Sequence, residues 1–240
     1  MKNKISRREY IKGAAAMVAA GAITQTAVGC TNDSANTVSF SSEFPVKYNV
    51  DVFIAGGGPA GCATAVSAAE TGHSVFLAEA HSCLGGMGTA AKVPVFMQLT
   101  DGKNFLCAGF GRRIIDSLRK NRRQGGEAND IEALKRVYDD LMVKSGAKFT
   151  FQTTLMAAKK TGNKIDYVLC CAPSGVFAVK AKVYIDCTGN GDLAVMSGAK
   201  WEMTPSNEGR IPATLCGVWG GIDWKKWHAV MPKDNPQPQG

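Results

Sequence analysis

The sequence Asp51-Val52-Phe53-Ile54-Ala55-Gly56-Gly57-Gly58-Pro59-Ala60-Gly61 joins a short apolar run to a glycine-rich turn. Residues 52–55 are apolar and largely branched or aromatic, which is typical of a strand buried on both faces of a parallel sheet. Gly56 permits a tight turn, Gly58 lets a pyrophosphate approach the backbone, and Gly61 lets the next helix pack closely. The pattern therefore predicts a strand, a turn and a helix that together bind a dinucleotide.

The residues after the turn agree with this prediction. A helix is predicted over residues 59–71, because Pro59 suits a first helical position and Gly72 suits the position just past the end. Pro59 itself has no N–H group, but the free N–H groups that follow it, at Ala60 and Gly61, would point at the phosphates. A second strand over residues 74–79 ends in Glu79, close to the roughly 20-residue spacing at which an acid meets a ribose hydroxyl. A glycine turn that binds nothing is the alternative reading.

Residues 1–30 are predicted to be an export signal. Lysines and arginines at positions 2, 4, 7, 8 and 12 precede an uncharged, alanine-rich run at residues 13–28. The stretch Ser6-Arg7-Arg8-Glu9-Tyr10-Ile11-Lys12 resembles the twin-arginine signal pattern. We therefore expect recognition by the twin-arginine export machinery and a periplasmic location, with an ordinary secretory signal as the alternative.

The end of this signal leaves two outcomes open. Ala27-Val28-Gly29-Cys30 is compatible with a lipoprotein cleavage box, which would leave Cys30 as a lipid anchor on a membrane-bound protein facing the periplasm. Cleavage nearby with loss of Cys30 is the alternative. We expect residues 31–48 to be a polar tether and residues 49–202 to form the nucleotide-binding domain.

Composition argues against two other classes of function. Residues 1–30 contribute half of the formal net charge of +8, so the remainder is only mildly basic and nucleic-acid binding is not expected. Basic residues between positions 112 and 123 are predicted to form the solvated face of an amphipathic helix. The eight cysteines show neither a Cys-x-x-Cys motif nor a cysteine–histidine ligand spacing, so no metal site is expected.

The second half of the chain alternates between helical and strand patterns. Asp130 is predicted to cap a helix that ends before Gly146, because apolar residues recur there with a helical period. Strands are predicted over residues 148–151, 155–159, 165–172, 176–180 and 183–187, as one more parallel strand, a small antiparallel meander and a return to the main sheet. A small-residue helix is expected from Asp192 through Ala199.

Two further loops can reach the ligand of the first turn. The loop Ala80-His81-Ser82-Cys83-Leu84-Gly85-Gly86-Met87-Gly88 lacks side chains at several points, so it can lie flat against a cofactor and donate N–H groups. The bend Asp186-Cys187-Thr188-Gly189-Asn190-Gly191-Asp192 follows the return strand at the carboxyl edge of the sheet, where ligands of such sheets bind.

These three pieces resemble, in order and spacing, those of two-dinucleotide-fold flavoproteins, and the chain looks like the exported FAD-dependent oxidoreductases distantly related to fumarate reductase flavoproteins. The resemblance covers roughly residues 49–225. It implies an α/β fold: a Rossmann-like parallel sheet that binds FAD, with a small antiparallel β-meander insertion, over residues 49–202. Residues 203–240 would begin a second, substrate domain that this chain leaves truncated.

The resemblance also implies which residues contact FAD. Gly56, Gly58 and Gly61 would hold the pyrophosphate, with Pro59 and Ala60 beside it, and Glu79 and Ala80 would lie at the adenosine ribose. Gly85, Gly86 and Met87 would lie at the flavin, Thr188, Gly189 and Asp192 at the pyrophosphate and ribitol, and Leu155 at the adenine through its backbone. The implied activity is hydride or electron transfer between a small molecule and the flavin. An NAD(P)-dependent dehydrogenase and a non-catalytic nucleotide-binding fragment are the alternatives.

Overall fold

The computed structural model describes residues 41–93, 96, 99, 101–120, 130–202, 213–218 and 220–230. The predicted export signal with Cys30, the first part of the tether and much of the segment after residue 202 lie outside these ranges. So do Trp219 and the side chains of Trp224 and Trp227. Of the helices in the described ranges, none has the length and apolar character needed to cross a membrane.

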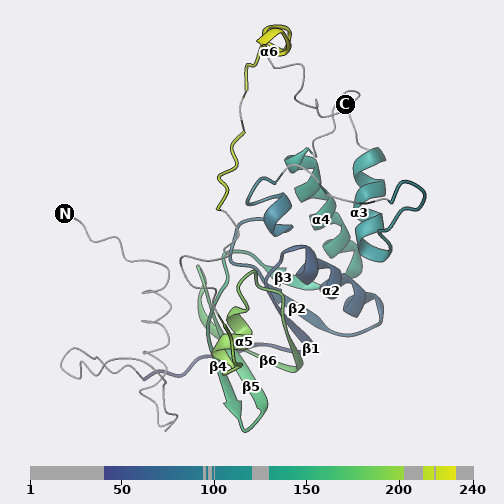
Figure 1. Ribbon diagram of the computed structural model, residues 1–240. Coiled ribbons are helices and arrows are strands. Elements are labelled where there is room, and N and C mark those ends of the chain that lie inside the picture. The colour runs from purple at the N-terminus through teal and green to yellow at the C-terminus, as the bar shows by residue number, and fades with distance from the viewer. Residues whose placement is uncertain are drawn as a thin grey trace, which may run out of the picture.

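A six-stranded sheet forms the centre of the described protein (Figure 1). Its strands are β1 (Val46–Ala55), β2 (Val75–Ala78), β3 (Lys148–Thr150), β4 (Thr154–Thr161), β5 (Lys164–Ala172) and β6 (Gly175–Asp186), in the spatial order β3-β2-β1-β6-β5-β4. Strands β3, β2, β1 and β6 are parallel, and β6, β5 and β4 form an antiparallel meander. The predicted α/β class, a Rossmann-like parallel sheet with a small meander, is confirmed.

The first strand, turn, helix and second strand form as predicted. Helix α2 (Pro59–Glu70) follows β1 and ends at Thr71, and Gly72 has the positive φ of a residue just past a helix end. Strand β1 begins at Val46, earlier than predicted, so the last residues assigned to the tether belong to the sheet. Tyr48 explains this extension, because its ring stacks on Phe76 at 3.7 Å and its backbone pairs with Val179.

The prediction of separate strands at residues 176–180 and 183–187 was wrong. These residues form the single strand β6, since Lys180, Ala181 and Val183 all pair with β1 and no turn residue interrupts them. The meander and the main sheet therefore share a strand. Helix α5 (Asp192–Met196) is also shorter than predicted, because Gly198 adopts a φ of +81° and its N–H bonds the carbonyl of Val195.

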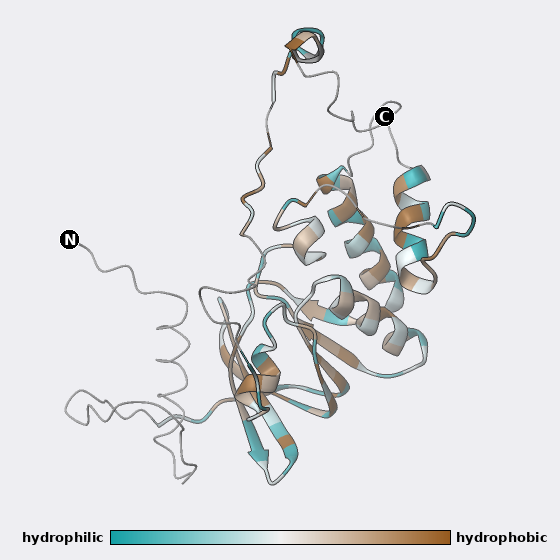
Figure 2. Ribbon diagram, in the orientation of Figure 1, coloured by the Kyte–Doolittle hydropathy of each residue, from teal (hydrophilic) through white to brown (hydrophobic). Residues whose placement is uncertain are grey.

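Three helices cover one face of the sheet (Figure 1). They are α2, α3 (Gly109–Lys120) and α4 (Ile131–Ser145). Asp130 caps α4 as predicted, accepting from the N–H groups of Glu132 and Ala133 at 3.0 Å each. Ile114 and Ile115 of α3 are buried, as expected for the inner face of an amphipathic helix. Figure 2 shows this mixture of hydrophobic and hydrophilic residues on α3 and α4, against strands β1 and β2 that are largely hydrophobic.

On the opposite face of the sheet, side chains of the parallel strands pack against side chains of the meander and of α5. Phe53 and Phe76 of the parallel strands share a core with Val168 and Phe177 of the meander and with Leu193 of α5. Each buried side chain of this size contributes about 1.5–3 kcal/mol to folding. Both faces of β1 are therefore buried at residues 52–55, whereas its first residues are exposed or partly exposed. The carboxyl end of β1, where the glycine turn begins, opens toward a ligand. The last described element is α6 (Trp224–Val230).

Candidate cofactor site

The glycine turn after β1 has no room for side chains at two positions. A Cβ added to Gly56, which has a φ of +93°, would lie 2.7 Å from the carbonyl oxygen of Cys187. A Cβ added to Gly61 would lie 1.8 Å from the carbonyl oxygen of Gly56. Glycine at these positions is thus required by the fold, because the turn folds back against its own helix and against the end of β6.

Gly58 differs from Gly56 and Gly61 because a Cβ there would meet nothing within 4 Å. This residue is the N-cap of α2, and no side chain caps the helix. The first backbone bond of the helix runs from Cys62 N–H to the Gly58 carbonyl at 3.0 Å, so the N–H groups of Ala60 and Gly61 lie ahead of it. Free N–H groups beside open space at a helix N-terminus suit an anion such as a pyrophosphate.

Glu79 holds the end of β2 against the glycine turn. Its side chain is buried, with one carboxylate oxygen accepting from Gly57 N–H and the other accepting from His81 N–H at 2.7 Å. A carboxylate has about four lone-pair sites, so both oxygens can still accept from ribose hydroxyls. The neighbouring Ala80 is exposed.

We expect Glu79→Gln to destabilise the protein by about 1–3 kcal/mol. The amide NH2 that replaces one carboxylate oxygen cannot accept a hydrogen bond, so one of the two backbone N–H groups would lose its acceptor. Urea unfolding monitored by circular dichroism measures this change. The matched control is Glu132→Gln, whose side chain is 67% exposed and pairs with Lys135 on the surface, so we expect it to change stability by less than about 0.5 kcal/mol. Equal stability of the two variants would contradict the bridging role of Glu79.

The loop at residues 85–88 packs directly on the glycine turn. Gly85 N–H donates to the Gly57 carbonyl at 2.8 Å, and a Cβ on Gly86 would lie 3.2 Å from the Cα of Gly58. A short 3-10 turn, η1 (Gly86–Gly88), follows, and the side chain of Met87 is 65% exposed. Met87, the residue after Gly86, therefore presents an apolar side chain to solvent.

The third bend is held by the carboxylate of Asp186. Its Oδ1 accepts from Thr188 N–H at 2.9 Å and from the Thr188 hydroxyl at 2.7 Å, while its Oδ2 accepts from Ala194 N–H at 2.8 Å. Thr188 Oγ1 in turn accepts from Asp192 N–H. Cys187 N–H bonds the Ala55 carbonyl at 2.8 Å, which places this bend, with the exposed Gly189, beside the glycine turn.

The segment before β4 lies next to the end of β2. Gln152 and Thr153 donate their N–H groups to the carbonyls of His81 and Glu79, at 3.0 and 2.8 Å. Leu155 follows two residues later, and its side chain packs into the core under the meander. A contact from Leu155 to a ligand would thus have to come from its backbone.

The structure adds residues that the sequence analysis did not select. Gly57 donates to Glu79 and accepts from Gly85, and a Cβ there would lie 2.7 Å from Leu84. Three consecutive glycines were the available signal for it. Asp186, an acid at the end of a strand, is the residue that shapes the third bend.

Two cysteines lie within the site and remain thiols. Burial raises the pKa of Cys62 to about 12, and its Sγ–H donates to the Gly57 carbonyl at 3.2 Å. Burial also raises the pKa of Cys187, whose Sγ lies 3.8 Å from the hydroxyl of Thr64. A thiol with a raised pKa is a poor nucleophile at neutral pH, so these cysteines support the packing of the turn.

The family model for FAD-dependent oxidoreductases matches residues 51–239, which is most of the chain. The chain belongs to this FAD-dependent oxidoreductase family. The match begins at Asp51, within β1, and so includes all three bends of the site. No curated protein sequence gave a significant match.

Solved structures resemble part of the chain at low identity. A geranylgeranyl bacteriochlorophyll reductase-like protein from Thermoplasma acidophilum is 18% identical over 64% of this chain and 43% of its own, with a TM-score of 0.46. THI4 of Thermovibrio ammonificans is 21% identical over 62% of this chain and 61% of its own, with a TM-score of 0.43. This chain therefore spans less than two thirds of the length of either structure.

FAD, the cofactor of the family, fits the described residues. The free N–H groups and open space at Gly58 suit its pyrophosphate, and the two remaining acceptor sites of Glu79 suit ribose hydroxyls. The loop at Gly86 lies against Gly58, where a second part of the same molecule would pass.

Proposed function

We propose that this member of the FAD-dependent oxidoreductase family binds one FAD across its three bends and transfers hydride or electrons between a small molecule and the flavin. The observation that carries the proposal is the contact among the bends. Gly85 N–H donates a hydrogen bond to the Gly57 carbonyl, and the backbone of Cys187 packs on Gly56. A glycine turn that served only the fold would need neither an uncapped helix N-terminus nor two loops gathered around it.

The three bends would share the contacts to FAD. The pyrophosphate would lie at Gly56, Gly58, Pro59, Ala60 and Gly61. Glu79, beside Ala80, would accept from the ribose, and the backbone at Leu155 would contact the adenine. Gly85, Gly86 and Met87 would face the flavin, and Thr188, Gly189 and Asp192 the ribitol and pyrophosphate. FAD supplies the redox chemistry when bound, and these residues position it and exclude water from one side.

Competition among nucleotides tests this assignment. Calorimetric titration of the full chain with FAD should show binding, and repeating the titration in the presence of each competitor measures displacement. ADP should compete, since Gly58, α2 and Glu79 hold the half of FAD that ADP shares, whereas FMN should compete at least about tenfold less well. FMN and ADP competing equally would contradict the placement of the adenosine half.

We also propose that the protein works outside the cytoplasmic membrane, as an exported enzyme distantly related to fumarate reductase flavoproteins. Support comes from Ser6-Arg7-Arg8-Glu9-Tyr10-Ile11-Lys12 and from the nature of the cofactor, because a fold that acquires FAD in the cytoplasm must cross the membrane intact. Cys30 is proposed as a lipid anchor. Neither segment lies within the described residues.

Cell fractionation tests the proposed export route. Replacing Arg7 and Arg8 together by lysine should keep the protein in the cytoplasm, because the twin-arginine route depends on the paired guanidinium groups rather than on charge. Replacing Lys2 and Lys4 by arginine is the matched control and should leave export unchanged. Continued export of the double-lysine variant would exclude the twin-arginine route.

A further inference from the structure

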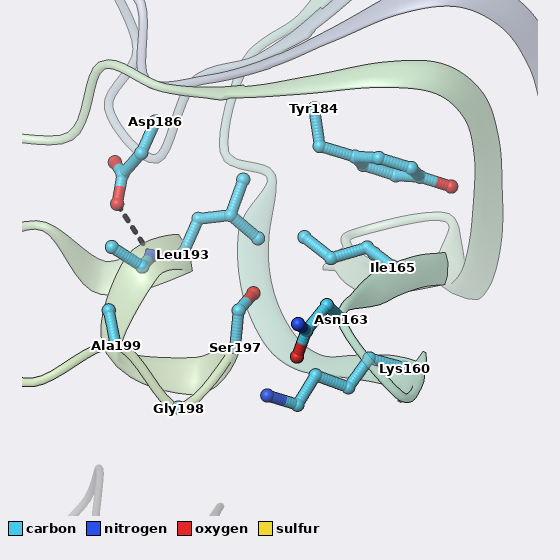
Figure 3. Close-up of a pocket in the computed structure, with 10 residues that line it drawn as sticks. Lys160, Asn163, Ile165, Tyr184, Asp186, Leu193, Ser197, Gly198 and Ala199 are labelled. Atoms are coloured by element: carbon cyan, nitrogen blue, oxygen red, sulfur yellow. Dashed lines mark hydrogen bonds between the residues drawn. The ribbon is translucent and has the colours of Figure 1, made fainter.

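A pocket lies on the meander side of the protein, between the β4–β5 hairpin, β6 and α5 (Figure 3). Its volume of about 400 Å³ is within the range of small-molecule sites. The side chains that matter for the argument are Lys160, Asn163, Ile165, Tyr184, Leu193 and Ser197. Of the residues that line the pocket, only Asp186 belongs to the three bends proposed to bind FAD.

One end of the pocket carries hydrogen-bond donors without partners. The Ser197 hydroxyl is inaccessible to solvent and has no hydrogen-bond partner, which is uncommon for a buried polar group. The Lys160 ammonium makes no ion pair or hydrogen bond within the described ranges. Its Nζ lies beside the residue that follows Ser197, since a Cβ on Gly198 would be 3.2 Å from Lys160 Nζ. Figure 3 shows the amide of Asn163 directed toward the same end.

The other end of the pocket is apolar. Ile165 and Leu193 contribute aliphatic surface, and Tyr184 contributes its ring (Figure 3). The Tyr184 hydroxyl is already engaged, because it accepts from Ala181 N–H at 2.8 Å and donates to the Asp166 carbonyl at 3.0 Å. Tyr184 is therefore available to a ligand only as a hydrophobic surface.

Asp186 limits the charge that the pocket can accept. Its carboxylate lines the pocket, but both oxygens accept backbone N–H groups, including that of Ala194 (dashed line in Figure 3). An anion with two charges would be repelled by this carboxylate more strongly than an anion with one. Together with the apolar end, this favours a singly charged ligand that has a hydrocarbon body.

We propose that this pocket binds a small aliphatic monocarboxylate. Its carboxylate accepts from the Lys160 ammonium and the Asn163 amide, and from the Ser197 hydroxyl after a rotation about χ1 turns that hydroxyl from its solvent-shielded position into the pocket. The two unpartnered donors thereby gain a charged acceptor. Its hydrocarbon chain packs against Ile165, Leu193 and the ring of Tyr184. The proposal rests only on the pocket, and it stands whether or not FAD binds at the glycine turn.

Calorimetric titration of the full chain with hexanoate, at constant ionic strength, tests the proposal. Hexanoate should bind at least about tenfold more tightly than hexanamide, which has the same shape and no charge. Lys160→Met and Ser197→Ala should each weaken hexanoate binding at least about tenfold. Lys159→Met is the matched control, because Lys159 is the next residue on β4, is absent from the pocket, and should leave the affinity unchanged.

Three results would overturn the proposal: no measurable binding of hexanoate, equal binding of hexanoate and hexanamide, or equal affinity in the Lys160→Met and Lys159→Met variants. Circular dichroism of each variant establishes that it is folded. If Ser197→Ala does not fold, Lys160→Met decides the question alone, because the half-buried Lys160 lies on a strand and its methionine variant keeps the same stem.

Discussion

Substitution of Gly61 by alanine is expected to destabilise the protein by about 3 kcal/mol or more, the upper part of the range for overpacking. The added methyl would lie 1.8 Å from the carbonyl oxygen of Gly56. That oxygen cannot retreat easily, because Gly56 N–H is bonded to the Ala78 carbonyl and Gly56 itself packs on Cys187. Urea unfolding of the full chain, followed by circular dichroism, measures the loss.

The control for this substitution is Ser67→Ala, an exposed position in the same helix. It improves helix propensity slightly and should leave stability within about 0.5 kcal/mol of the original. If Gly61→Ala were as stable as Ser67→Ala, the close approach of α2 to the turn would be wrong, and with it the placement of the helix N-terminus beside the ligand.

Gly58→Ala is expected to leave the fold intact and to weaken FAD binding at least about tenfold. Gly58 has a φ of −67°, which alanine adopts readily, and its Cβ would meet no protein atom within 4 Å. The methyl would instead occupy the space in which the pyrophosphate approaches the backbone. Fluorescence titration with FAD measures the affinity, and thermal unfolding without FAD measures the stability.

The comparison between the two glycine variants separates folding from binding. Gly61→Ala should lose stability with or without FAD, whereas Gly58→Ala should lose only the additional stability that bound FAD confers. If Gly58→Ala binds FAD as tightly as the original protein, the pyrophosphate does not lie at the start of α2. Ser67→Ala serves again as the control, with unchanged affinity.

Local signals allowed much of the fold to be predicted from the sequence. Pro59 and Gly72 mark the ends of α2, and Asp130 and Gly146 mark the ends of α4, because caps act within one turn of the helix. The division of β6 was wrong for the opposite reason. Its continuity depends on pairing with β1 and β5, which are distant in sequence, and residue patterns do not report such pairing.

The same distinction applies to the candidate site. Gly56, Gly58 and Gly61 could be selected because each has a role within one short motif. The contact of Glu79 with Gly57, and that of Gly86 with Gly58, join segments that only the folded sheet brings together. The donors at Lys160 and Ser197 were not predicted at all, since no spacing rule links a hairpin to a helix 37 residues further along the chain.

The pairing of β1 with β6 has a consequence for how the protein is made. Val52 pairs with Val183 and Ala55 with Asp186, so one edge of β1 has no partner until the ribosome has synthesised β6. Contacts between such distant residues slow folding. Until then the apolar strand β1 has an unpaired edge at which nascent chains can aggregate. Molecular chaperones that shield β1 would therefore raise the yield of folded protein.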